Sequence, residues 1–354
     1  MLRQLARLTR RVPAAGPRAL AIAIYGDGEG HALEAPGEGV ACVDDAARAV
    51  ELLALVWQAN QSPWIHRWAL GLLDFVLWMH QGDGLWVNFI SNWEGDLNRD
   101  GVTSAPGVNF WQARGLSAAV TGATILGQAE AESAALAGLA AAAGARPAPD
   151  VRSIQLLALG RWMDGGRAGQ VAGRQDDWAE EIAACRIDRI LMNSPEERGT
   201  PHLWGHVQEA ALSQAGVALG RRDLIELAEA SASALFSPII EGGFPAPHVQ
   251  PYDVQSAIEV MDALAAATGR VGYAELAGLA RAWFSGRNPS GAAVYDRVRG
   301  LVADGVDDSV VSLGSGAESN IVGGLALPEA AAAVSFEGEP EGHPEYAEWA
   351  PARS

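Results

Sequence analysis

The 354-residue sequence contains no lysine, and all 25 of its basic residues are arginine. This absence excludes a Schiff-base lysine, pyridoxal phosphate chemistry and the lysine of a Walker-type phosphate loop. The base composition of the genome is the simplest explanation for a chain that is rich in Ala, Arg and Gly but has no lysine. Any chemistry must therefore rely on other side chains.

Cysteine is also scarce. The two cysteines, Cys42 and Cys185, lie far apart, which indicates neither a disulfide framework nor the ligand spacing of a zinc site. A reducing compartment fits this usage best. We expect no metal and no other cofactor.

Basic residues are fewer than acidic residues. The chain has 43 acidic against 25 basic residues and a formal net charge of −18, which disfavours nucleic acid and anionic membranes as partners. The apolar run ALAIAI near the start is too short to span a membrane, and the segment before it lacks the order of a signal peptide. We therefore expect a cytoplasmic protein.

Helical patterns dominate what is present, and the 49% apolar content is enough for a large core. Strand signals are nearly absent apart from ALAIAIY. We expect a single domain over residues 1–327 and a peripheral acidic, Pro-rich tail over 328–354. The expected helices span about 43–60, 63–80, 109–127, 129–144, 150–163, 176–192, 203–219, 222–236, 252–268, 271–285 and 316–327.

These helices alternate in character. Helices rich in Ala, Gly and small polar residues are followed by helices with charged faces, which indicates an inner and an outer layer. Five or six such hairpins predict an all-α (α/α)6 barrel, a toroid whose inner helices surround a cavity. An open α-solenoid is the alternative, but the helix starts follow no fixed period.

The stretch GVACVDDAARAV (39–50) places two aspartates at the entry of an apolar helix. Capping needs only one of them. We expect Asp44 to cap the helix and Asp45 to face the cavity as a general base. Neighbouring carboxylates at a buried edge are typical of acid–base sites, although capping and dipole interactions remain the simpler explanation.

Polar and aromatic residues also open the other inner helices, in NFWQAR, LWGHVQE, PYDVQ and GAESN. A pocket of carboxylates, amides and indoles is typical of a sugar site. Among the tryptophans at helix mouths or in loops, Trp86 is a further aromatic candidate, while six others are expected in the core: Trp64, Trp68, Trp78, Trp162, Trp178 and Trp283. The expected substrate-binding residues are Arg48, Trp93, Trp111, Gln112, Arg114, Trp204, His206, Glu209, Tyr252 and Asp253.

Two possible metal sites can be set aside. DLNRDG (96–101) begins like a calcium loop, but Gly107 stands where a bidentate Glu is required, so an Asx-rich turn is the better interpretation. His206, which we expect one turn inside its helix near Glu209, lacks further ligands.

The motifs VDDAAR, WQARGL, WFSGRNPSG and GAESN resemble those of six-hairpin glycosidase-type proteins, of the bacterial kind found beside or fused to glycosyltransferases. A more distant similarity is to glycoside hydrolase family nine. That family has an Asp pair in its first hairpin, a G-x-NP segment late in the chain and a catalytic-acid Glu just before the final helix. Asp44 and Asp45, Gly286 to Pro289, and Glu318 follow this order, although the family's histidine-rich substrate motif is missing here.

The resemblance implies an inverting glycoside hydrolase that acts on an oligo- or polysaccharide, with an Asp base and Glu318 as the acid. We expect partial burial to keep Glu318 protonated. A polysaccharide lyase or sugar epimerase that uses His206 or Tyr252 for proton transfer is an alternative, as is a non-catalytic sugar-binding module. The oligomeric state is not readable from the sequence.

Overall fold

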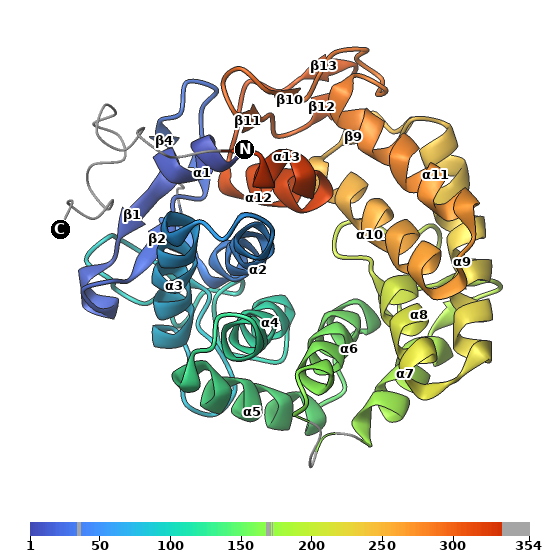
Figure 1. Cartoon of the computed structure of the whole chain (residues 1–354), viewed down its shortest axis with the longest axis horizontal. Helices are drawn as coiled ribbons and strands as arrows, with labels where there is room; N and C mark the ends of the chain where they lie inside the picture. The colour runs from blue at the N-terminus through green and yellow to red at the C-terminus, as the bar shows by residue number, and fades with distance from the viewer. Residues whose placement is uncertain (34–36, 168–170, 172, 335–354) are drawn as a thin grey trace. The chain divides into compact units, whose positions relative to one another are not determined.

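The computed structural model describes residues 1–33, 37–167, 171 and 173–334, and the greater part of the expected tail, 335–354, lies outside the described residues. The chain divides into two compact units (Figure 1). Unit 1 comprises Met1–Gly138, Tyr295–Asp304 and Ser312–Ser354, and unit 2 comprises Leu139–Val294 and Gly305–Val311.

Unit 1 is built from helices that pack around α2. In Figure 1, α2 lies among α3, α4 and α12, and α13 also packs against it. The boundary between the units falls within α5. The helices are α1 (Leu2–Leu8), α2 (Val43–Asn60), α3 (Pro63–Trp78), α4 (Phe110–Thr124), α5 (Ala129–Ala143), α12 (Ala317–Ala326) and α13 (Pro328–Ala332), with the 3-10 turn η1 (Pro13–Ala15).

Burial of α2 follows from its composition. Its sequence is apolar on nearly every face, and residues on all sides of the helix are buried, including Val43, Ala47, Val50 and Leu53. A helix of this kind is stable only when neighbours cover it on several sides. The expectation of a buried first inner helix is therefore confirmed.

The strands of unit 1 are pairings of two or three residues. ALAIAIY contributes β2 (Leu20–Ile22), which pairs antiparallel with β1 (Thr9–Arg11), and the beginning of β3. Such short pairings are too brief to show period-two alternation, so no hydrophobic pattern predicts most of them. The others are β3 (Tyr25–Gly26), β4 (Ala32–Leu33), β5 (Ala41–Cys42), β6 (Phe89–Ile90), β10 (Tyr295–Asp296) and β11 (Leu301–Val302).

Unit 2 consists of three helical hairpins. Helices α6, α8 and α10 pack side by side, and α7, α9 and α11 are their partners (Figure 1). The helices are α6 (Pro149–Asp164), α7 (Arg174–Ala184), α8 (Gln208–Leu219), α9 (Arg222–Glu241), α10 (Pro251–Thr268) and α11 (Val271–Arg281), followed by the 3-10 turn η2 (Ala282–Ser285). The strands are β7 (Arg186–Ile187), β8 (Ile190–Leu191), β9 (His248–Val249), β12 (Val306–Asp307) and β13 (Val310–Val311).

Four expected helix boundaries in unit 2 are wrong. Helix α9 runs to Glu241 and not to 236, and α11 ends at Arg281, where η2 follows it. The other two errors have a cause in the backbone. The helix expected over 176–192 ends at Ala184, because β7 and β8 form a hairpin in which Asp188 adopts a φ of 54°. An aspartate tolerates this left-handed conformation better than most residues. The helix expected from 203 begins at Gln208, because Gly205 has a φ of 67°, which no α-helix contains. His206 therefore lies in a loop and not inside the helix.

The first residues of the expected tail form helix α13. Its Ala331 is fully buried, and the carbonyl of Ala332 accepts a hydrogen bond of 3.2 Å from Nδ2 of Asn60 in α2. The segment 328–332 is therefore packed against the core of unit 1. A search of the described helices finds no segment whose length and apolar character would let it cross a bilayer.

Candidate active site

The first turn of α2 is held by two residues outside the Asp pair. Sγ of Cys42 accepts a hydrogen bond of 3.4 Å from the backbone N–H of Asp45, which makes Cys42 the N-cap. Oδ1 of Asn88 accepts a bond of 3.1 Å from the N–H of Asp44. The expectation that Asp44 caps the helix is therefore wrong, because both aspartates lie one and two residues inside it.

Arg48 connects three carboxylates through one guanidinium group. Its Nη2 lies 3.2 Å from Oδ2 of Asp44 and 2.9 Å from Oδ1 of Asp45. Its Nη1 lies 2.7 Å from Oε1 of Glu318, at the start of α12. A guanidinium presents five donors in a rigid plane, which suits it to bind several carboxylates at once.

Arg114 of α4 approaches Asp44 from another side and forms an ion pair with the same Oδ2. We call Asp44, Asp45, Arg48, Arg114 and Glu318 the carboxylate–arginine cluster. Oδ1 of Asp44, in contrast, is buried and has no hydrogen-bond partner within the described parts of the chain. Buried carboxylate oxygens are normally bonded, so this atom marks a place where a ligand or water can bind.

Asp45 is almost completely buried, and burial raises the pKa of its carboxyl group to about 7. The charges of Glu318 and Asp44 raise this pKa further, whereas Arg48 lowers it. With every group ionised, the cluster holds three negative and two positive charges. A proton on Asp45 removes the excess negative charge, so this carboxyl group exchanges a proton near neutral pH.

Glu318 is half-buried, as expected. Its side chain is 41% exposed and is paired with Arg48. The turn that carries it is rigid: Oδ1 of Asp304 accepts bonds of 2.7 Å from the N–H of Gly316 and 2.8 Å from Oγ of Ser319. Asp304 thus fixes the start of α12 and, through it, the position of Glu318.

The other residues of unit 1 that we expected to bind substrate differ in how deeply they are buried. Gln112 is fully buried, and its amide donates to the carbonyls of Gly84 and Gly138. Trp93 and Trp111 are half-buried, and the indole N–H of Trp111 donates to a backbone carbonyl at 3.1 Å. In this conformation the Gln112 side chain therefore connects two backbone segments inside the protein and does not face solvent.

Trp86, a loop candidate for sugar stacking, is fully buried instead. Its indole N–H donates to the carbonyl of Val76 at 2.9 Å, so it belongs to the core. Four of the six tryptophans expected in the core are buried, and Trp64 and Trp78 are half-buried. Position in a loop is a poor guide to burial when the loop packs inward.

In unit 2, His206 and Glu209 form a completely buried pair. Nε2 of His206 lies 3.1 Å from Oε2 of Glu209, and its Nδ1 lies 2.7 Å from Oδ1 of Asn193. Ser231 also donates to Oε1 of Glu209. Both imidazole nitrogens are thus engaged inside the protein, and neither side chain presents surface to solvent.

Tyr252 and Asp253 lie at the start of α10. Oδ2 of Asp253 accepts a bond of 3.0 Å from the N–H of Gln250, as part of a capping box. This carboxylate therefore has a local structural role. Trp204, by contrast, is exposed in the loop before α8.

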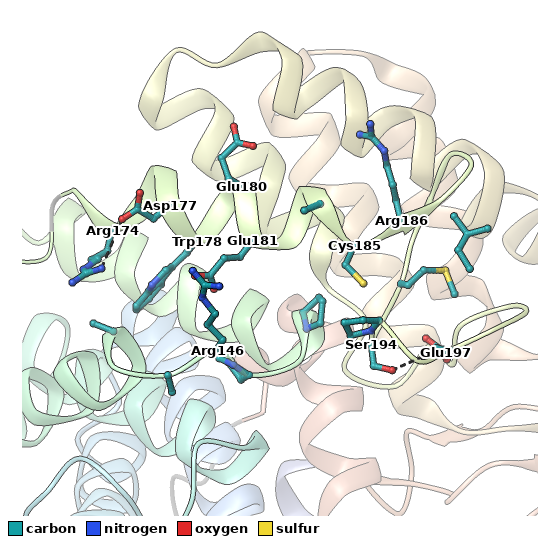
Figure 2. Close-up of a pocket in the computed structure, with 18 of the residues that line it drawn as sticks. Arg146, Arg174, Asp177, Trp178, Glu180, Glu181, Cys185, Arg186, Ser194 and Glu197 are labelled. Atoms are coloured by element: carbon teal, nitrogen blue, oxygen red, sulfur yellow. Dashed lines mark hydrogen bonds and ion pairs between the residues drawn. The ribbon is translucent and has the colours of Figure 1, made fainter.

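A cavity of about 1210 Å³ lies in unit 2, beside α7 and the loops that precede α6 and α8 (Figure 2). Trp178, Glu181, Cys185 and Arg146 line it, and none of the site residues expected from the sequence does. Glu181 is bound by Arg152 at 2.8 Å, and the guanidinium of Arg152 also stacks over Trp178. Within the described ranges, no group of three His, Cys, Asp or Glu residues is arranged to hold a metal ion.

Sequence reasoning missed three residues that shape the carboxylate–arginine cluster: Cys42, Asn88 and Asp304. Asn88 had a signal, because it is the polar residue in the otherwise apolar run LWVNFI. Cys42 had none, since cysteine is rarely an N-cap. Asp304 had no signal either, because it belongs to none of the motifs that contain the other residues of the cluster.

No family model matches the sequence, and no curated protein matches it either. Solved structures do match. A sugar epimerase from a ruminal bacterium superposes with a TM-score of 0.69 at 12% identity, over 95% of this chain and 96% of its own. A D-mannose isomerase gives 0.68 at 10% identity, over 93% and 95% of the two chains.

A glycoside hydrolase family 9 endoglucanase also matches, with a TM-score of 0.57 at 12% identity, over 93% of this chain and 83% of its own. All three neighbours are (α/α)6 toroid enzymes. The chain has the (α/α)6 toroid fold. The fold class and the fold-level similarity to family nine expected from the sequence are thereby confirmed. At such low identity the match concerns the fold alone.

Proposed function

We propose that this toroid is a carbohydrate-active enzyme and that the carboxylate–arginine cluster is its catalytic centre. The observation that carries the proposal is the carboxylate of Asp44. Two guanidinium groups hold one of its oxygens, and the other oxygen is buried without a partner among the described residues. An unpaired buried acceptor is costly, and a water molecule or a sugar hydroxyl group can supply the missing hydrogen bond.

The reaction we propose is hydrolysis of a glycosidic bond, with inversion, in an oligo- or polysaccharide. Asp44 is the general base, because its unpaired Oδ1 can orient the attacking water. Glu318 is the acid that protonates the leaving oxygen, and its exposed side chain is able to contact a ligand. Inverting enzymes keep their base and acid on opposite sides of the bond, with room for this water.

Arg48 has to release Glu318 for this reaction, because a carboxylate bound to a guanidinium is not a proton donor. In the proposed reaction, substrate binding displaces Arg48 from Glu318, and the freed carboxylate takes up a proton from solvent water. The resulting carboxyl group then donates to the glycosidic oxygen. Asp45 lies too deep to contact substrate in this conformation. We therefore assign Asp45 as a positioning residue that shares the guanidinium and sets the charge of the cluster.

A substrate screen tests the proposal directly. The full chain is incubated with aryl glycosides and oligosaccharides, and NMR follows the anomeric configuration of the first product. Release of a reducing end with inverted configuration, lost in Asp44→Asn, supports the assignment. Product with retained configuration, or full activity in that variant, contradicts it.

A second candidate is a sugar epimerase or isomerase. It is favoured by the two neighbours of this kind, whose chains this one covers almost completely. In that case His206 or Tyr252 is the proton-transfer group considered from the sequence. His206 is completely buried with Glu209 in this conformation, so its use requires a change of conformation that brings a sugar to the pair.

Incubation of reducing sugars in D2O separates the candidates. An epimerase or isomerase exchanges a carbon-bound hydrogen next to the carbonyl and changes the sugar, whereas an inverting hydrolase does neither. Loss of exchange in His206→Gln, with no effect of Asp44→Asn, supports the second candidate. Sugar binding without any turnover identifies a non-catalytic module.

A further inference from the structure

A second cluster with accessible polar and aromatic groups lies in unit 2. Asp150 stands in the first turn of α6, and His202 and Trp204 lie in the loop that leads to α8. Helices α6 and α8 pack against each other, which brings these segments together. Of these three residues, only Trp204 is a candidate from the sequence.

His202 and Trp204 form a flat surface. Their rings stack with centroids 4.5 Å apart and an angle of 12° between the planes. Nδ1 of His202 lies 3.1 Å from the carbonyl oxygen of Trp204, which fixes the orientation of the imidazole. Trp204 is 38% exposed, so part of this preorganised aromatic surface faces solvent. Aromatic faces of this kind bind the apolar face of a pyranose ring.

A polar gap lies beside this surface. Oδ1 of Asp150 accepts a bond of 2.7 Å from the N–H of Val151, and Oδ2 points to Nε2 of His202 at 4.0 Å. A separation of 4.0 Å is too long for a hydrogen bond. Nδ1 of His202 must carry the proton to donate to the carbonyl oxygen of Trp204, so Nε2 and the carboxylate Oδ2 are both acceptors. Each of them can accept a hydrogen bond from one of two neighbouring hydroxyl groups.

We propose that Asp150, His202 and Trp204 form a sugar-contact site, in which a pyranose ring stacks on Trp204 and two of its neighbouring hydroxyl groups donate hydrogen bonds, one to Asp150 and one to His202. The inference deepens the proposed function and rests on it for the class of ligand. It concerns binding only, and it involves no residue of the carboxylate–arginine cluster.

The state of the carboxyl group is consistent with this role. Burial raises the pKa of Asp150 to about 6, the nearby His206 lowers it, and Glu197 raises it. Burial also lowers the pKa of His202. Near neutral pH an ionised carboxylate therefore faces a neutral imidazole, and both groups can accept hydrogen bonds from hydroxyl groups.

Ligand-observed NMR with the full chain tests the site. The probes are D-glucose, D-mannose, D-galactose, N-acetyl-D-glucosamine and a disaccharide of each. We expect Trp204→Ala and Asp150→Asn to weaken binding of the preferred sugar by roughly tenfold. Trp204→Phe keeps an aromatic face and should retain most of the affinity.

The chain offers a matched control. Trp57 and His66 form a similar ring contact in unit 1, with centroids 4.5 Å apart and an angle of 30°. Trp57→Ala should leave sugar binding unchanged. Circular dichroism of each variant verifies that the fold is intact.

The outcomes separate this site from the catalytic proposal. Loss of binding in Trp204→Ala supports the site even if Asp44→Asn shows that the catalytic assignment is wrong. Wild-type affinity in both Trp204→Ala and Asp150→Asn overturns the site, whatever the catalytic variants do. Failure of the wild-type chain to bind any of the eight probes overturns it as well.

Discussion

Nη1 of Arg48 lies 2.7 Å from Oε1 of Glu318, a contact between residues 270 positions apart in the chain. The same guanidinium binds Asp44 and Asp45, so one side chain joins the start of α2 to the start of α12. Arginine can do this because its donors point in several directions within one plane. The arrangement makes distinct predictions for each carboxylate.

Glu318→Gln removes the proposed acid while its shape is kept. Turnover of a substrate with a poor leaving group should fall by roughly 10²–10⁴-fold. Turnover of a substrate with an activated leaving group should fall less, because its departure needs little help from an acid. Steady-state kinetics on both substrates measures the difference. Glu29→Gln, which removes a surface ion pair with Arg299, serves as the control. Equal losses on both substrates would count against an acid role.

Asp44→Asn keeps a side-chain oxygen but removes the base. Activity should be lost on both kinds of substrate, because water attack is required whatever the leaving group is. The same kinetic assay measures it, with Asp74→Asn at the surface pair with Arg18 as the control. If Asp44→Asn retains full activity and Asp45→Asn is inactive, the base is Asp45, as the sequence first suggested.

The stability of the protein should depend on pH through Asp45. Its pKa is about 7 in the folded chain against an ordinary value of 3.8, so the native state binds the proton more tightly than the unfolded state does. This contribution is fully present at low pH and is lost as pH rises through about 7.

Asp45→Asn removes that titration, because the amide resembles the protonated acid. The wild-type chain should therefore lose more stability between pH 5 and pH 8 than Asp45→Asn does. Urea unfolding of both proteins at each pH measures the difference. Parallel stability profiles would show that Asp45 does not titrate in this range.

Cys42 should contribute to stability as the N-cap of α2. Cys42→Ser retains a side-chain acceptor for the N–H of Asp45, whereas Cys42→Ala does not. The free energy of unfolding of the Ala variant should be lower than that of the Ser variant by about 1 kcal/mol. Equal values in urea titrations would mean that the sulfur makes no useful hydrogen bond.

Two truncations separate α13 from the residues that follow it. Removal of the segment after residue 336 should leave the melting temperature nearly unchanged, because its Pro, Gly and acidic residues offer little apolar surface to bury. Removal of everything after 327 should lower it, since Ala331 is buried and Ala332 is bonded to Asn60. A large drop in the first truncation would contradict the expectation of a peripheral tail.

The helices could be predicted because their signal is local. Residues of α2, α3 and α10 repeat with the helical period over several turns, and the observed bounds agree closely with the expected ones. Two of the errors fall where a turn interrupts a helical composition, at Asp188 and at Gly205. A single left-handed residue changes the path of the chain without changing the hydrophobic pattern around it.

The sequence by itself determined the toroidal class and marked the Asp pair and Glu318 as candidates, because hydrophobic period and the order of motifs are properties of the linear chain. Only the tertiary structure decided that Cys42 caps α2, that Asp45 is buried with a pKa raised to about 7, and that Glu318 is bound to Arg48. Burial and hydrogen-bond partners depend on residues far away in the chain, such as Asn88 and Arg114, which no local pattern connects to the pair.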